Sequence, residues 1–144
     1  MHMDSTQNDL PFVLHDVARL MRTRFDQHAR RLWGMTRAQC VILMKLDHQP
    51  GLCQTELAAL LEVEPITVAR LIDRLETRGM VERRPDPKDR RIWRLHLLPP
   101  ATPVLAELHT ERAAMHRMAT ADIDPETEQT MIEGLKRMKA TILG

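Results

Sequence analysis

The sequence predicts a mainly α-helical protein with one small β-hairpin. Apolar residues recur at three- and four-residue steps over most of the 144 residues, which is the period of a helix. From Met80 to Leu98 the period changes to two, which is typical of strands. The chain has ten Met, only four Trp and Phe together and no Tyr, a composition that favours a core built from helices. Its length fits a single domain spanning residues 1–144.

The first two predicted helices carry most of the N-terminal apolar residues. A helix over residues 9–31 has one apolar stripe, formed by Leu10, Val13, Leu14, Val17, Met21 and Phe25. Thr36 and Gln39 have the spacing of a capping box at the start of a second helix, and residues 40–46 are nearly all apolar. We expect this second helix to be buried on most sides and to end at the "HQPG" segment, residues 48–51.

Two shorter helices and the hairpin follow. Leu57, Leu60 and Leu61 mark a third helix. Pro65 can open a fourth, whose apolar residues Val68, Leu71, Ile72 and Leu75 precede a stop at Gly79. Val81 and Arg83 then alternate with Glu82 and Arg84, and Trp93, Leu95 and Leu97 alternate with Arg94 and His96. The Pro-Asp-Pro-Lys-Asp turn at 85–89 lies between these predicted strands.

The last two helices lie beyond the hairpin. Pro99 and Pro100 end the second strand, and a helical stripe resumes with Val104, Leu105, Leu108, Met115 and Met118. Asp124 is a suitable N-cap followed by Pro125 at the first helical position. The final stripe consists of Met131, Ile132, Leu135, Met138 and Ile142.

Two short helices joined by a tight turn and followed at once by a hairpin are the parts of a winged helix-turn-helix. Ala58 is small enough for the helices to cross closely, and the β-branched Val68 can fix the second helix. The turn lies at Glu62-Val63, and Glu62 occupies the position where many such turns carry Gly. We therefore expect a DNA-binding lobe at 36–98. The amphipathic helices outside it have too little within one chain to cover their apolar stripes, so we expect a helical dimerisation region at 9–31 and 101–144; an intramolecular helical core is the alternative for any single stripe.

Positive charge is concentrated in this lobe. Residues 66–94 hold nine Lys and Arg against five Asp and Glu, although the whole chain has a formal net charge of only +1. The stretch "RRPDPKDRRIW" at 83–93 is the densest part. Basic runs are usually solvated surface, but at the tip of a hairpin beside a helix-turn-helix this charge favours contact with DNA phosphates and the minor groove.

The segment "ELAALLEVEPITVARLIDRLETRGMVERRPDPKDRRIWRLHL" resembles the multiple-antibiotic-resistance regulator (MarR) family. The shared features are Leu57-Ala58, the D-x-L-E-x-x-G pattern at 73–79, Glu82-Arg83 and the D-x-x-D-x-R wing at 86–91. "ITVARLIDRLE" and "ATPVLAEL" are nearest the family's SlyA branch. The chain departs from the pattern at Leu98-Pro99-Pro100, where relatives have Leu-Thr, and at Trp93, where they have a smaller or polar residue.

The resemblance implies a sequence-specific, DNA-binding transcriptional regulator that acts as a homodimer on an inverted-repeat operator in double-stranded DNA. It implies a repressor released by a small anionic or phenolic effector. Asp89 would orient Arg91, which would enter the minor groove. The expected DNA-contacting residues are Gln54, Thr55, Pro65, Ile66, Thr67, Arg70, Arg74, Lys88, Asp89, Arg90 and Arg91.

Candidates for sensing are fewer. By the resemblance, His15, Arg22 and Cys40 fall near the effector region, although each also suits an ordinary surface or core position. Cys53 occupies an N-cap slot, where a lowered thiol pKa would permit redox sensing and a tolerated poor cap is the alternative. His109 and His116 lie seven residues apart, but no set of Cys or carboxylates completes a metal site, so no metal and no cofactor are expected.

Other classes of protein have less support. The sequence has no glycine-rich phosphate loop, no nucleophile elbow and no His-Glu-x-x-His motif, so we expect no enzyme activity. It has no apolar run of membrane-spanning length and no leader pattern, and two Cys fit a reducing compartment, so a cytoplasmic location without membrane contact is expected. A winged helix used for protein–protein contact is the serious alternative. That function would require apolar residues in place of Thr67, Arg70 and Arg74.

Overall fold

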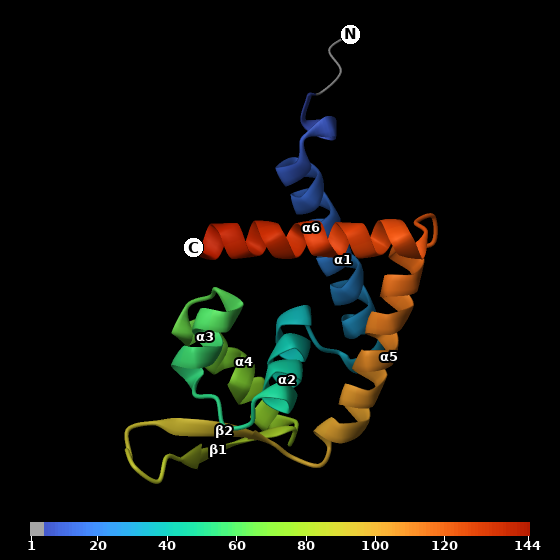
Figure 1. Cartoon of the computed structure of the whole chain (residues 1–144). Helices are drawn as coiled ribbons and strands as arrows, with labels where there is room; N and C mark the ends of the chain where they lie inside the picture. Colours follow the sequence, from blue (N-terminus) through green and yellow to red (C-terminus); the bar gives the residue numbers. More distant parts are fainter. Residues whose placement is uncertain (1–4) are drawn as a thin grey trace. The chain divides into compact units, whose positions relative to one another are not determined.

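The computed structural model describes residues 5–144 and confirms the predicted class (Figure 1). The elements are η1 (Ser5–Asn8), α1 (Leu10–Trp33), α2 (Arg37–His48), α3 (Gln54–Leu61), α4 (Pro65–Thr77), β1 (Val81–Pro85), β2 (Trp93–Leu97), α5 (Ala101–Ala119) and α6 (Pro125–Leu143). Contacts divide the chain into two compact units, Met1–Leu108 and His109–Gly144. The predicted element order is therefore correct, and α1 runs two residues past its expected end.

Short-range capping explains several helix boundaries. The capping box at the start of α2 is complete: the Thr36 hydroxyl accepts from the Gln39 amide at 3.3 Å, and the Gln39 side chain accepts from the Thr36 amide at 2.8 Å. The Asp124 carboxylate accepts from the Thr127 amide at 2.6 Å, one turn into α6. Both predicted caps are confirmed. Local hydrogen bonds therefore fix the starts of α2 and α6, and the spacing of the capping residues in the sequence is enough to predict them.

Helix α2 lies at the centre of the first unit, in contact with α1, α3, α4 and β2. Its side chains Cys40, Ile42, Leu43 and Leu46 are at most 1% exposed, as the almost unbroken apolar segment predicts. The surrounding elements contribute Phe25, Ala29, Leu57, Val68, Ile72, Leu75, Val81, Leu95, Ala101, Leu105 and Leu108 to the same core. The helix-turn-helix and the hairpin therefore share one core with the C-terminal part of α1 and the N-terminal part of α5.

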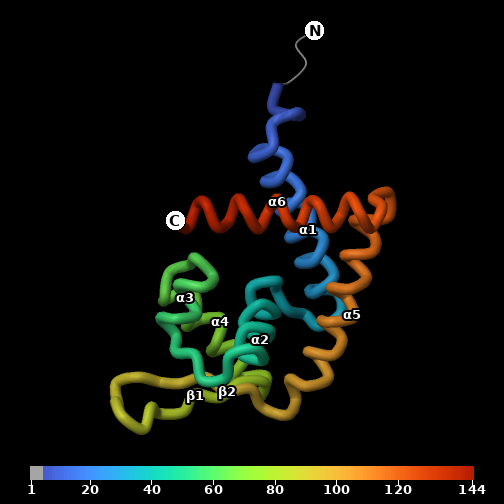
Figure 2. Tube along the Cα trace, in the orientation of Figure 1, coloured from blue at the N-terminus to red at the C-terminus, as the bar shows by residue number. Residues whose placement is uncertain are grey.

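The two strands pair antiparallel from Val81↔Leu97 at the base to Pro85↔Trp93 near the turn. At the base, the Gly51 amide donates to the Leu95 carbonyl and the Leu95 amide donates to the Leu52 carbonyl, each at 3.0 Å. The loop between β1 and β2 projects away from the helices (Figure 2). The predicted alternation therefore holds only near the base: Leu95 is 1% exposed, whereas Trp93, beside the loop, is 50% exposed.

Apolar side chains remain exposed on α1 and α6. On α1 these are Leu10, Phe12, Val13, Leu14, Val17, Leu20 and Met21; on α6 they are Met131, Ile132, Leu135, Ile142 and Leu143. No residue of α6 is buried, although a hydrogen bond between the His116 and Glu128 side chains joins α5 to α6 inside the second unit. In the part of the chain from residue 5 onward, no helix is long and apolar enough to cross a membrane. Within residues 5–144, α1 and α6 are therefore amphipathic helices whose apolar faces are open to solvent.

The turn between α3 and α4 stores backbone strain at Glu62. Glu62 has φ 55° and ψ 42°, the left-handed conformation, and it is the one non-glycine residue with positive φ among residues 5–144. Its amide and that of Val63 close the end of α3 onto the carbonyls of Ala59 and Ala58, at 3.3 and 3.1 Å. A residue with a Cβ pays roughly 1–2 kcal/mol for this conformation. This is the position at which many helix-turn-helix turns carry Gly, as expected from the sequence.

We expect Glu62→Gly to raise the free energy of unfolding by about 0.5 kcal/mol, because the relief of strain exceeds the added chain entropy of glycine. Gly34→Ala is the matched opposite. Gly34 has φ 63° and nothing within 4 Å of an added Cβ, so this change should lower stability by about 1 kcal/mol through backbone strain alone. Urea unfolding of both variants tests the expectation, and midpoints that move in the same direction would contradict it.

Candidate nucleic-acid interface

Helices α3 and α4 are locked together at their starts as well as at the turn. The Gln54 side-chain amide donates to the Pro65 carbonyl at 3.1 Å, so the first residue of α3 holds the first residue of α4. Ala58 and Val68 are 4% and 0% exposed, in the positions where close helix crossing requires small and β-branched residues. The two helix N-termini are thereby held in one fixed arrangement.

The face of α4 opposite its buried residues is polar and positively charged. Thr67, Arg70 and Arg74 are exposed on it, while Val68, Ile72 and Leu75 are buried on the other side. Pro65 and Ile66 are exposed at the first turn, and Ile66 is 64% exposed. Among residues 5–144, neither Arg70 nor Arg74 has an ion-pair partner. Their charge is therefore available to a ligand.

The acids of α4 are neutralised from the hairpin. Arg83 Nη2 lies 2.8 Å from Asp73 Oδ1, and Arg83 Nη1 lies 2.8 Å from Glu76 Oε1. The Arg83 amide also donates to Glu76 Oε2 at 3.3 Å. Arg83 therefore packs β1 against α4 and at the same time compensates two negative charges of α4.

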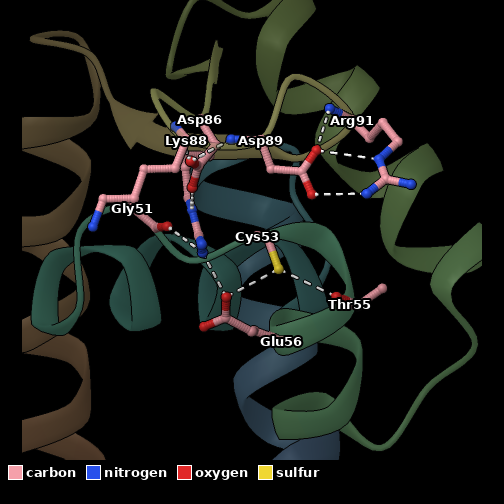
Figure 3. Close-up of polar contacts among 9 residues, drawn as sticks. Gly51, Cys53, Thr55, Glu56, Asp86, Lys88, Asp89 and Arg91 are labelled. Atoms are coloured by element: carbon pink, nitrogen blue, oxygen red, sulfur yellow. Dashed lines mark hydrogen bonds and ion pairs between the residues drawn. The ribbon is translucent and has the colours of Figure 1, made fainter.

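The wing turn at residues 86–92 is ordered by its own acids (Figure 3). Asp86 Oδ1 accepts from the amides of Lys88 at 2.7 Å and Asp89 at 3.1 Å. Asp89 Oδ1 accepts from the Arg91 amide at 3.0 Å and from Arg91 Nε at 3.2 Å, and Asp89 Oδ2 accepts from Arg91 Nη2 at 3.4 Å. The predicted contact between Asp89 and Arg91 is present, and the Arg91 side chain is 91% exposed.

The other basic residues of the turn are exposed. Neither Lys88 nor Arg90 has an ion-pair partner among the residues that the structure describes, and both side chains face solvent. Arg84, by contrast, pairs with Glu82 on its own strand. The outer part of the wing therefore presents Lys88, Arg90 and Arg91 as its available cations.

A second, inner arginine connects the wing to α3. Arg94 Nε donates to Asp86 Oδ2 at 2.8 Å, and Arg94 Nη1 donates to Glu56 Oε1 at 2.6 Å. Arg94 lowers the pKa of Asp86, helped by the amide of Lys88. The Cys53 thiol, followed by Arg94, lowers the pKa of Glu56. Both carboxyl groups are therefore ionised at neutral pH, and in return Asp86 and then Glu56 raise the pKa of Arg94.

The N-termini of α3 and α4 have no side-chain cap. The N-cap residues are Cys53 and Glu64, and neither accepts a hydrogen bond from its helix through its side chain. The Cys53 thiol instead donates to Glu56 Oε1 at 3.0 Å and lies 3.2 Å from the Thr55 hydroxyl. Thr55 is exposed and Gln54 is half-buried. The start of α3, with uncapped amides and a favourable dipole, is therefore suitable for phosphate oxygens. At α4, Pro65 has no amide hydrogen and the Thr67 amide donates to the Glu64 carbonyl at 3.0 Å.

The sequence did not predict that Arg83 and Arg94 form ion pairs inside the lobe. Both fall in the basic region 66–94, which the sequence predicts to contact DNA as a whole. One signal was available: Arg83 alternates with Val81 on the inward face of the strand, and it pairs in register with the buried Leu95. An arginine on an inward face needs a carboxylate partner. Nothing in the spacing showed that Arg94 reaches Glu56, 38 residues away.

The candidate sensing residues lie in different environments. His15 and Arg22 are exposed on α1, and His15 lines a depression of about 310 Å³ with Pro11 and Phe12. Burial and then the charge of Arg22 lower the pKa of Arg37, at the start of α2. Cys40 is 0% exposed in the core.

A larger pocket lies elsewhere in the first unit. It measures about 410 Å³ and is lined by Gly34, Thr36, Gln39, Asp73, Arg74, Thr77 and Arg78. None of His15, Arg22 and Cys40 lines it. Within residues 5–144, no three His, Cys, Asp or Glu side chains are placed to share a metal ion.

Comparisons with known proteins place this geometry in one family. The MarR family matches residues 35–93, which include α2, the helix-turn-helix, β1 and the wing turn as far as the first residue of β2. The HTH-type transcriptional regulator YsmB of Bacillus subtilis is 35% identical over 104 residues, covering 72% of this chain and 70% of that protein. A protein of Thauera aromatica named for transcriptional regulation of the hcr operon is 29% identical over 117 residues, covering 79% and 70%.

Solved structures share the fold. A crystal structure of MarR aligns with a TM-score of 0.85 at 24% identity, covering 99% of this chain and 96% of that one. The transcriptional regulator SlyA aligns with a TM-score of 0.81 at 24% identity, covering 94% of each chain. The MepR–DNA complex of Staphylococcus aureus aligns with a TM-score of 0.78 at 21% identity, covering 92% and 97%.

The environment of Cys40 gives a chemical prediction. Burial, followed by the charge of Asp26, raises the pKa of its thiol to about 11, and the thiolate is the reactive form. In a Cys53→Ser variant, Cys40 should therefore resist iodoacetamide at neutral pH in the folded protein and react fully in denaturant. Mass spectrometry of the alkylated protein measures this. Rapid labelling of the folded variant would contradict the buried position of Cys40.

Proposed function

The chain belongs to the MarR family of winged-helix transcriptional regulators, and we propose that it binds specific operator DNA through α3, α4 and the wing. Its family and relatives are regulators of transcription and not enzymes. We further propose that it acts as a repressor of the genes it controls.

The distribution of paired and unpaired charge is the observation that carries this proposal. Arg83 and Arg94 neutralise Asp73, Glu76, Asp86 and Glu56 inside the lobe. Arg70 and Arg74 on α4, and Lys88 and Arg90 on the wing, are exposed without an acid partner within the described residues. A helix face and a hairpin tip of one sign suit the phosphates that flank two grooves of DNA.

The proposed contacts divide into groove and backbone contacts. On α4, Arg70 would contact a guanine edge or a phosphate, and Thr67 a base or backbone oxygen. Pro65 and Ile66 would press on thymine methyl groups, and Arg74 would hold a phosphate. Gln54 and Thr55 would contact phosphate at the uncapped start of α3.

On the wing, Arg91 would enter the minor groove, oriented by Asp89. Lys88 and Arg90 would contact phosphates beside it. The Arg91 guanidinium is exposed and donates two hydrogen bonds to Asp89, and the Arg91 backbone amide donates a third, which supports these separate roles for Arg91 and its neighbours.

We propose that the active form is a homodimer. The apolar stripe along the N-terminal part of α1 and the apolar residues of α6 are exposed in the single chain, and surfaces of this kind mark protein–protein contacts. The MepR–DNA complex of Staphylococcus aureus shares the fold. A two-fold dimer would recognise inverted half-sites about one helical turn apart.

We propose that a small molecule regulates DNA binding. An anionic or phenolic effector would bind near His15, Arg22 and Cys40; the exposure of His15 and Arg22 supports their access to a ligand, whereas Cys40 is enclosed. The segments "ITVARLIDRLE" and "ATPVLAEL" support a place near the SlyA branch. A thiol sensor is less favoured, because Cys40 and Cys53 are both buried. A protein-docking winged helix is also less favoured, because the outward face of α4 carries Thr67, Arg70 and Arg74.

Selection from random duplex DNA should recover an inverted repeat, and its affinity should fall steeply with salt. With six to ten phosphates neutralised, the affinity would drop by about 10³–10⁵ between 50 and 200 mM salt. Fluorescence anisotropy with the selected duplex measures the slope. Failure to enrich any sequence, together with an affinity that hardly depends on salt, would exclude this function.

Arg91→Ala should strongly weaken specific binding and leave the protein folded. The exposed turn adds little to the core, so the change in stability should be no more than about 0.5 kcal/mol. Loss of an arginine from the minor groove should cost roughly 1–3 kcal/mol per half-site. Asp89→Ala should weaken specific binding nearly as much, because it removes the carboxylate that orients Arg91.

Lys88→Ala is the matched control for these variants, since Lys88 is exposed in the same turn. It should weaken binding to all sequences mildly and reduce the salt slope. Operator affinities are compared beside melting curves. If Arg91→Ala binds like the parent and Lys88→Ala does not, the assignment of residues on the wing is wrong.

Sedimentation equilibrium at micromolar concentration should show a dimer. The exposed apolar residues of α1 predict that Val17→Glu, which puts a charge into the stripe, shifts the population toward monomer. Arg19→Glu, on the same helix but outside the stripe, is the control. A folded monomer for the parent protein would refute the dimer.

A further inference from the structure

We propose that Arg94 is a positioning residue for DNA recognition, which clamps the wing turn to the start of α3 and so fixes Arg91 relative to the helix-turn-helix. The inference rests on the proposed function. Arg94 itself is held by two carboxylates, Asp86 and Glu56, and is not among the residues proposed to contact DNA.

The clamp joins two segments that are far apart in the sequence. Arg94 lies eight residues after Asp86 and 38 residues after Glu56, and it binds both carboxylates at 2.8 and 2.6 Å. Its Nη1 also lies 3.4 Å from the Gly51 carbonyl. The Arg94 side chain is 31% exposed and that of Asp86 is 13% exposed, so solvent screens this pair less than a surface ion pair.

On the wing side, the clamp acts through Asp86. Asp86 Oδ2 is used by Arg94, while Oδ1 accepts from the amides of Lys88 and Asp89. Asp89 in turn holds the backbone and guanidinium of Arg91. A continuous series of hydrogen bonds therefore runs from Arg94 to Arg91, and Figure 3 shows its Asp86, Lys88, Asp89 and Arg91 members together.

On the helix side, the clamp acts through Glu56. Glu56 lies in the first turn of α3, directly after Thr55, and its carboxylate also accepts from the Cys53 thiol. The backbone bonds of Leu95 to Gly51 and Leu52 already set the distance between β2 and the start of α3. The two ion pairs of Arg94 then fix the orientation of the wing turn relative to the start of α3.

An arginine is needed for this geometry. Its planar guanidinium presents Nε and Nη1 toward two separate carboxylates at once, whereas a lysine offers a single flexible ammonium group. A wing held in place before binding loses less conformational entropy when it enters a groove. The expected effect is therefore on specific binding, where the position of Arg91 matters, and not on general attraction to phosphates.

The test is a double-mutant cycle on the full chain. Specific affinity is measured with the duplex selected by the parent protein, and non-specific affinity with a shuffled duplex of the same length. The variants are Arg94→Met, Arg94→Lys, Arg91→Ala and Arg94→Met/Arg91→Ala. Arg84→Met is the control, because Arg84 is the cross-strand neighbour of Arg94 and pairs with Glu82 on its own strand.

We expect Arg94→Met to weaken specific binding by about tenfold and non-specific binding by less than about twofold. In the Arg91→Ala background, the same change should cost less than about twofold, because its effect passes through Arg91. Arg94→Lys keeps the charge and should still lose specific affinity by several-fold. Arg84→Met should change both affinities equally and by at most about twofold. Amide exchange at Lys88 and Asp89 should accelerate in Arg94→Met without DNA.

Three results would overturn the inference: unchanged specific affinity in Arg94→Met, an equal loss with and without Arg91, or an equal loss on both duplexes, which would make Arg94 a direct phosphate contact. If Arg94→Met does not fold, Arg94→Lys decides, and parental specific affinity in that variant rejects the clamp. A parent protein that prefers no sequence would reject the proposed function and the inference with it. Loss in Arg91→Ala alone would leave the function standing and reject only the clamp.

Discussion

Burial of α2 is the constraint on which the DNA-binding lobe depends. Four of its side chains are almost fully enclosed, and each buried large apolar side chain contributes roughly 1.5–3 kcal/mol. A helix buried on most sides must be covered by several neighbours, and here these are α1, α3, α4 and β2. Because α4 packs on α2 through its own buried stripe, its opposite face is directed outward. The orientation of Thr67, Arg70 and Arg74 is thus a consequence of packing at the core.

The lobe also separates its charges by position. The partly buried arginines Arg83 and Arg94 bind carboxylates of α3, α4 and the wing turn. Among the residues that the structure describes, the exposed cations of α4 and the wing turn have no acid partner at Arg70, Arg74, Lys88 and Arg90, whereas Arg91 is paired with Asp89, which holds its orientation. A region with a modest excess of basic residues can therefore present a surface that is much more positive than its composition suggests.

Local strain and missing caps occur where the proposed interface lies. Glu62 adopts a left-handed conformation in the turn between the two helices, and Cys53 and Glu64 leave the helix starts uncapped. A serine cap at position 53 or a glycine at position 62 would satisfy local preferences better. Free amides at a helix start can bind phosphate. The residues that depart from local preference therefore lie where the proposed function needs them.

The sequence by itself determined the order of elements, the caps at Thr36 and Asp124, the buried helix α2 and the exposed face of α4. Each of these follows from spacing within a few residues, where backbone geometry converts sequence directly into position. Tertiary structure decided which basic residues are available. The pairing of Arg83 with α4 and the bridge from Arg94 to Asp86 and Glu56 join segments distant in the sequence, and only the packing of β1 and β2 on the helices brings those charges within hydrogen-bonding distance.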